Sequence, residues 1–253
     1  MRLEDLNRVL ILVAHPDDET IGCGGLLQRV PSALVVFAVD GAPAGYGFER
    51  KFGSLKNYSE ERFREAGRAL GLLPNCPFRR LQSRSGAYFP DRHLFENLQE
   101  AAASLVAITQ EFLPDAIVTH AYEGGHIDHD ACSFLANHTA KALLIECFEF
   151  PLYWNNGPGR DVFQEFRNAQ EGKIVLNLYE PEIAIKEKML ATYETQREIV
   201  ATFSPHIEKF RPATGSDFGR PSWNAYPPGN WRSRREARAV LRRFSEFPRM
   251  ASG

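Results

Sequence analysis

The sequence predicts an α/β fold, a Rossmann-like and mainly parallel sheet with helices on both faces and a functional site at the carboxyl edge of the strands. Short apolar runs such as residues 8–13 and 33–39 lack the polar alternation of a half-exposed strand, which is typical of strands buried on both faces. Segments of helical periodicity alternate with these runs. Acidic residues and histidines directly follow several runs, at the edge where open α/β sheets bind ligands.

Composition narrows the class of protein. The 253 residues suffice for one α/β domain or two small ones, and 43% hydrophobic with 25% charged residues is ordinary for a globular chain. The net charge of −2 predicts no nucleic-acid partner, and no apolar run approaches the roughly 18 residues of a membrane span. The four cysteines are scattered without a Cys-x-x-Cys pair, and the first residues lack a signal pattern. We therefore expect a cytoplasmic protein with reduced thiols.

The expected elements follow from apolar periodicity and from the positions of Gly and Pro. We expect strands over residues 8–13, 33–39, 76–81, 116–120, 145–150 and 173–178. We expect helices over residues 20–29, 60–70 (with Ser59 as the N-cap), 93–112, 130–144, 180–200 and 233–244. Residues 42–57 and 151–172 are expected to form loops, the first of them a possible flap. Without a repeat or linker, we expect a single domain over 1–253, with a segment rich in Pro, Gly and aromatic residues from about 201.

His15, Asp17 and Asp18 follow the first expected strand, and Pro16 stiffens the turn between them. Imidazole and carboxylate together suit zinc and similar divalent ions. A helix N-terminus would by itself favour acidic residues here through the helix dipole. It would not require the histidine, so the pattern indicates a metal site.

A second cluster, His126, Asp128 and His129, follows the expected strand 116–120. Because parallel strands open at one edge, this cluster and the first can converge. A catalytic zinc usually has three protein ligands and one open position, so His15, Asp18 and one of the later histidines could form the set. A loop histidine bonded to a backbone carbonyl would explain either histidine alone. The combination of the two clusters favours a metal.

The segments Ala14–Glu19 and His126–His129 resemble the hallmark motifs of the zinc-dependent de-N-acetylases called PIG-L or LmbE-like proteins. Weaker similarity over residues 39–41, 62–71, 114–115 and 193–196 extends the resemblance through most of positions 8–200. That family acts on compounds containing N-acetylglucosamine. The resemblance implies that His15, Asp18 and His129 hold Zn²⁺ or another divalent transition metal.

The resemblance also implies roles for the other residues of the two motifs. Asp17 would be the general base, and His126 would bind the oxyanion or protonate the leaving amine. Asp128 would orient one of the histidines. The chemistry agrees, because bound zinc lowers the pKa of its water to about 7, and a carboxylate beside the ligands can take that water's proton.

We therefore expect a hydrolase that removes the N-acetyl group from an N-acetylglucosamine-type sugar or glycoside, a small-molecule partner. Two alternatives remain open. The same site could cleave another small amide, such as a thiol conjugate or a natural-product intermediate, or the chain could bind metal or carbohydrate without catalysis. Asp17 and His126 argue against a pure binder, which would not need them. A homo-oligomer is also possible.

Substrate contacts are the least specific part of the prediction. Asp40, Arg62 and Glu123 lie near expected carboxyl edges and could bind sugar hydroxyls, although a solvated helix face equally explains Arg62. Aromatic residues could also form the floor of a sugar site, but packing under a long loop explains most of them better. These residues are Tyr153, Trp154, Trp223, Tyr226 and Trp231.

Overall fold

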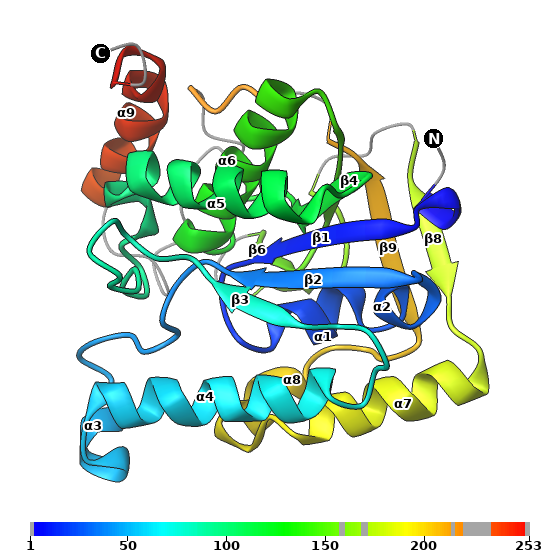
Figure 1. Ribbon diagram of the computed structural model, residues 1–253. Coiled ribbons are helices and arrows are strands. Elements are labelled where there is room, and N and C mark those ends of the chain that lie inside the picture. The colour runs from blue at the N-terminus through cyan, green and yellow to red at the C-terminus, as the bar shows by residue number, and fades with distance from the viewer. Residues whose placement is uncertain (1–2, 157–159, 168–171, 214–215, 220–233, 251–253) are drawn as a thin grey trace.

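The computed structural model describes residues 3–156, 160–167, 172–213, 216–219 and 234–250. Its main sheet has the strand order β3-β2-β1-β4-β5-β9-β8 (Figure 1). The strands are β1 (Arg8–Val13), β2 (Ser32–Phe37), β3 (Phe78–Arg80), β4 (Ala116–His120), β5 (Glu146–Phe150), β8 (Ile174–Asn177) and β9 (Ile207–Pro212). Strands β1 to β5 pair in parallel, whereas β9 pairs antiparallel with both β5 and β8. The expected mainly parallel α/β sheet is thus confirmed.

Helices cover both faces of this sheet (Figure 1). Helices α5 (Leu98–Phe112), α6 (Ile127–Leu143) and α9 (Arg234–Met250) lie on one face. The other face carries α1 (Asp18–Cys23), α2 (Leu26–Arg29), α4 (Leu55–Leu70), α7 (Glu180–Ala191) and α8 (Arg197–Val200). No helix in the described part of the chain is both long enough and apolar enough to cross a bilayer.

Strand β1 shows how the two layers form. Its side chains alternate, so Leu10 and Leu12 enter the core beneath α5 and α6, while Ile11 and Val13 enter the core beneath α1 and α4. These four side chains are fully buried. An uninterrupted apolar run is therefore the pattern that this strand needs.

Several helix boundaries differ from the expected ones. The helix expected at residue 60 begins at Leu55, and Ser54 is its N-cap, accepting the Asn57 N–H at 3.1 Å. Ser59 lies inside the helix and donates its hydroxyl to the Asp40 carbonyl. The expected loop over 42–57 was thus wrong, because it holds α3 (Phe48–Phe52) and the first turn of α4.

Two more expected helices are interrupted in the structure, one is shorter than expected, and one expected loop contains strands. The expected helix 20–29 is two helices, and the expected helix 93–112 is a 3₁₀ turn (Leu94–Glu96) followed by α5. The expected helix 180–200 ends at Ala191 and is followed by a second 3₁₀ turn (Glu194–Gln196) and α8. The expected loop 151–172 contains a small antiparallel pair, β6 (Tyr153–Asn155) and β7 (Asp161–Phe163).

Candidate metal and catalytic site

The two sequence motifs meet at the carboxyl ends of neighbouring strands β1 and β4. His15 follows β1, and Asp18 is the first residue of α1. His129 lies in the first turn of α6. The Asp18 Oδ2 atom lies 3.2 Å from His15 Nδ1 and 3.4 Å from His129 Nε2. Asp18 Oδ2 therefore lies close to both imidazoles, and all three side chains are buried although His15 and His129 are 114 positions apart in the sequence.

The donor atoms at this point fit a divalent metal. His129 Nε2 is buried and has no hydrogen-bond partner among the described residues, which is costly unless something binds it. The ring nitrogens of His15, His126 and His129 lie within 4.8 Å of one another, as do donor atoms of Asp18, His120 and His129. Two imidazoles with one carboxylate are a set that zinc and related transition metals accept.

His120, the last residue of β4, is a member of this cluster that sequence reasoning missed. Its ring stacks on the His129 ring at a centroid distance of 3.9 Å, and its Nε2 lies 3.4 Å from Asp18 Oδ2. That nitrogen already accepts the Ala14 N–H at 3.1 Å. Burial, followed by the neighbouring His129, lowers the pKa of His120 to about 3. Its place at the carboxyl end of a buried strand was the signal that could have found it.

Asp17 lies beside the cluster in an unusual backbone conformation. Its φ of 127° is in a region that non-glycine residues rarely adopt. Its carboxylate accepts a hydrogen bond from Arg62 of α4 at 3.0 Å. Burial raises the pKa of Asp17 to about 8, and Arg62 opposes that rise. A carboxyl group so placed suits proton transfer near neutral pH.

His126 is the N-cap of α6, and its Nδ1 accepts the Asp128 N–H at 3.2 Å. With Nδ1 as an acceptor, the neutral ring carries its proton on Nε2. Burial, followed by the neighbouring His15 and His129, lowers the pKa of His126 well below its usual range. The ring edge therefore offers an N–H donor next to the cluster, 4.6 Å between centroids from His15.

Asp128 lies closer to His15 than to His126. Its Oδ2 is 3.6 Å from His15 Nε2 and 4.0 Å from His126 Nδ1. The same carboxylate accepts the N–H groups of Arg92 and Leu94, at 2.6 and 3.2 Å. Asp128 thus links the segment before α5 to α6. It also places a carboxylate next to the Nε2 side of the His15 ring, the usual arrangement around a histidine that binds a metal.

Asp91 is a second residue that sequence reasoning missed. Its Oδ2 lies 3.5 Å from His15 Nε2, and its side chain is buried. Burial alone would lower the pKa of His15, but the carboxylates of Asp91, Asp128 and Asp18 raise it well above its usual value. Asp91 belongs to an irregular segment with no motif and no periodicity, so no pattern in the sequence pointed to it.

A cavity of about 160 Å³ opens onto these residues. Its apolar wall comprises Ile21, Pro43, Tyr153, Ile199 and Phe203. Its polar wall comprises His15, Asp17, Asp18, Arg62, Asp91, Arg92, His126, His129 and Gln196. Gly125 makes room at its edge, because a Cβ there would lie 1.8 Å from the Tyr153 carbonyl oxygen.

The expected substrate residues divide between the cavity and its surroundings. Arg62 lines the cavity, and its guanidinium also donates to the carbonyls of Gly41 and Pro16. Asp40 and Glu123 are not among the described residues that line the cavity. Asp40 accepts the N–H groups of Ala42 and Asp91, so it shapes the loop that carries Asp91.

Glu123 is buried and accepts the Arg167 N–H at 2.9 Å. Of the aromatic candidates, Tyr153 lines the cavity and Trp154 donates its indole N–H to the Glu165 carbonyl. Trp223, Tyr226 and Trp231 lie outside the described residues.

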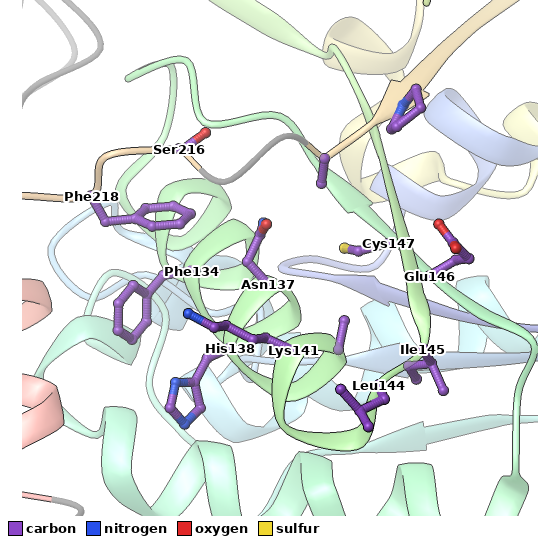
Figure 2. A pocket seen from close by; sticks show the side chains of 13 residues that line it. Phe134, Asn137, His138, Lys141, Leu144, Ile145, Glu146, Cys147, Ser216 and Phe218 are labelled. Carbon is purple, nitrogen blue, oxygen red and sulfur yellow. The ribbon is translucent and has the colours of Figure 1, made fainter.

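A larger cavity, of about 710 Å³, lies elsewhere, between α6, the start of β5 and the segment after β9 (Figure 2). Side chains of His138, Lys141 and Phe218 face it, together with Glu146 and Cys147 (Figure 2). The residues of the two sequence motifs are not among the described residues that line it. The chemistry is therefore concentrated in the smaller cavity.

The fold and the cluster define a mixed α/β protein with a buried His/Asp centre suited to a divalent metal. Residues 10–140, more than half of the chain, match the PIG-L family model, described as GlcNAc-PI de-N-acetylase. The chain belongs to the PIG-L family. No curated protein matches it at a significant level.

Solved structures share the fold. A deacetylase of the teicoplanin biosynthetic pathway, as a triple mutant, is 19% identical and superposes with a TM-score of 0.64, covering 83% of this chain and 99% of its own. The A40926 pseudoaglycone deacetylase is 17% identical with a TM-score of 0.63, covering 84% and 100%. The N,N'-diacetylchitobiose deacetylase from Pyrococcus horikoshii is 15% identical with a TM-score of 0.53, covering 90% and 89%.

Proposed function

We propose that this protein is a metal-dependent N-deacetylase that releases acetate from an N-acetylglucosamine-type sugar or glycoside. The observation that carries the proposal is the position of Asp18 Oδ2 within 3.4 Å of both His15 Nδ1 and His129 Nε2, with Asp17 and His126 lining the same cavity. Membership of the PIG-L family and the names of the structural neighbours support the same activity.

His15, Asp18 and His129 would hold the metal. A bound Zn²⁺ or similar ion would polarise the acetyl carbonyl and acidify a water molecule. Asp17 takes the proton from the attacking water, and its hydrogen bond to Arg62 fixes the carboxylate for that transfer.

His126 stabilises the anionic intermediate. Its Nε2–H donates to the anionic oxygen that develops as the acetyl carbon becomes tetrahedral. The proton held by Asp17 then passes to the amine nitrogen as the C–N bond breaks, because an amine leaves an amide only when it is protonated.

The cavity's size bears on the substrate. At about 160 Å³ it is smaller than the roughly 300–1,000 Å³ of pockets that enclose a whole small molecule. It therefore encloses only part of the substrate, and we assign that part as the acetamido group. The structural neighbours are named for three different compounds, teicoplanin, the A40926 pseudoaglycone and N,N'-diacetylchitobiose. The rest of the substrate thus contacts the outer surface.

The test is acetate release by the purified protein from N-acetylglucosamine, diacetylchitobiose and aryl N-acetylglucosaminides, with and without a chelator. We expect release that the chelator abolishes. If the protein hydrolyses other small amides in a chelator-sensitive way but releases no acetate from any of these sugars, its substrate is another small amide and not an N-acetylated sugar. Turnover of neither class by metal-loaded protein would contradict the proposal.

A further inference from the structure

Asp17 is held at its backbone as well as at its carboxylate. The Asp17 N–H donates to Glu19 Oε2 at 3.0 Å. Glu19 is fully buried, and its other oxygen accepts the hydroxyl of Thr20 at 2.7 Å and the hydroxyl of Tyr193. A buried carboxylate with all these partners is fixed in orientation. The Asp17 backbone, at a φ that a non-glycine residue rarely adopts, therefore depends on Glu19.

Tyr193 belongs to a segment that is distant from Glu19 in the sequence and is hydrogen-bonded to α4. This segment, residues 193–196, follows α7. Thr195 donates its N–H to Glu65 Oε1 at 2.8 Å and its hydroxyl to Glu65 Oε2. Gln196 donates to the Tyr58 hydroxyl at 2.6 Å. These three bonds hold the segment against the helix that carries Arg62.

These contacts close a ring around Asp17. The Asp17 carboxylate binds Arg62, and Glu65 lies three residues further along α4, on the same face of the helix. Glu65 accepts the Thr195 N–H, and Tyr193 of the same segment donates its hydroxyl to Glu19. Glu19 in turn accepts the Asp17 N–H, which completes the ring. Arg62, Glu65, Tyr193 and Glu19 are all buried, and Thr195 is half-buried.

We propose that the Tyr193–Glu19 hydrogen bond is a positioning device for Asp17, which holds the base in its strained backbone conformation during catalysis. The proposal rests on the proposed deacetylase function, in which Asp17 is the base. Neither residue touches the substrate in this account. Both act through the geometry of Asp17, and the 193–196 segment is the structural support of that geometry.

Tyr193→Phe removes one hydroxyl and keeps the buried ring. We expect kcat to fall about tenfold, the size expected for losing one hydrogen bond to a charged group, with KM and metal content unchanged. Tyr122→Phe is the matched control, because Tyr122 is also buried but packs against Phe218 and Phe244 on the other face. It should keep the wild-type kcat.

A double variant shows whether Tyr193 affects kcat by positioning Asp17 or by stabilising the fold in general. In an Asp17→Ala background, Tyr193→Phe should not lower the residual kcat further, because the base on which it acts is gone. If Tyr193→Phe lowered kcat by the same factor in both backgrounds, or left it unchanged in the wild-type background, the proposal would be wrong.

Amide hydrogen exchange gives a readout that needs no turnover. In ¹⁵N-labelled protein, the Asp17 amide should exchange about tenfold faster in Tyr193→Phe than in the wild type and in Tyr122→Phe. Unchanged Asp17 exchange would overturn the inference whether or not the protein proves to be a deacetylase. Faster exchange in a protein without amide turnover would support the Tyr193–Glu19–Asp17 linkage and contradict only the proposed function.

Discussion

At the scale of single residues, two adjacent carboxylates have different surroundings and different proposed roles. Asp18 points at the histidines, with its Oδ2 3.4 Å from His129 Nε2, whereas Asp17 points at Arg62. The difference comes from the backbone, since Asp17 has a φ of 127° just before α1 begins at Asp18. Two adjacent residues therefore face different partners, as the proposed roles of Asp18 as a ligand and Asp17 as the base require.

This division predicts opposite outcomes for two alanine variants. Asp17→Ala should keep metal near the wild-type stoichiometry and lower kcat by roughly 10² or more, as for the loss of a general base. His129→Ala should lose most of the bound metal, because one of three ligands is gone. Elemental analysis beside acetate release measures both. Equal metal loss in the two variants would show that the assigned roles are wrong.

The candidate site was predictable where a residue type and a strand end coincided. His15, Asp18 and the pair His126 and His129 carry metal-binding groups and follow apolar runs, so the sequence predicts that the two clusters converge, whereas only the family resemblance singles out His129. Asp91 could not be inferred, because its approach to His15 depends on an irregular loop held by Asp40. The φ of Asp17 could not be predicted either, because tertiary contacts impose this backbone angle and the residue type does not indicate it.

At the scale of elements, close packing sets the tolerance for side-chain volume. A Cβ on Gly22 of α1 would lie 2.3 Å from the Phe150 ring of β5, whereas a Cβ on Gly67 of α4 would lie 3.7 Å from Phe78, an ordinary contact. We expect Gly22→Ala to lower the free energy of unfolding by about 1–3 kcal/mol through overpacking.

Gly67→Ala is the matched control and should raise the free energy of unfolding by about 0.5–1 kcal/mol, the cost of glycine inside a helix. Urea denaturation measures both variants. If Gly22→Ala were as stable as the wild type, α1 would not pack against β5 as described.

Strand β9 shows why part of the sheet escaped prediction. Its sequence contains Glu208, Lys209 and Arg211, so it lacks the apolar run that is present in β1, β2 and β4. Two of these charges are nevertheless buried, because Glu208 pairs with Lys186 at 2.6 Å and Arg211 pairs with Glu149. Partners from distant parts of the chain make such burial possible, and local pattern does not reveal them.

The Lys186–Glu208 pair carries its own prediction. Lys186 Nζ also donates to the Ile21 carbonyl, and Glu208 accepts the N–H groups of Gly25 and Leu26, so the pair joins α7 and β9 to α1 and α2. Lys186→Met should lower the free energy of unfolding by about 3–5 kcal/mol, because it leaves a buried carboxylate without its cation. Thermal and urea denaturation measure this loss.

The companion variant Lys186→Met with Glu208→Gln should recover much of that stability, since no uncompensated charge remains. If the single variant were as stable as the wild type, the pair would not be buried as described.

At the scale of the whole molecule, buried acids make stability depend on pH. Burial raises the pKa of Glu123 from its usual 4.5 to about 8. The folded protein therefore binds this proton more tightly than the unfolded chain. Its contribution to stability is complete below about pH 4.5 and is lost as the pH rises towards 8.

Glu123→Gln replaces the protonated acid with a neutral group of the same size. The variant should gain stability over the wild type as the pH rises from about 4.5 to 8, by on the order of a few kcal/mol. Urea denaturation at a series of pH values measures the difference. Parallel curves for the two proteins would show that Glu123 does not titrate as described.

In the proposed function, the cluster at the carboxyl ends of β1 and β4 holds a metal, and hydrolysis of an acetamido sugar requires that metal. The most direct test is to strip the protein with a chelator, remove the chelator, and titrate Zn²⁺ back while acetate release from N-acetylglucosamine glycosides is followed. We predict that activity returns in proportion to bound metal and reaches its plateau at about one equivalent. Acetate release that persists in metal-free protein would contradict the account.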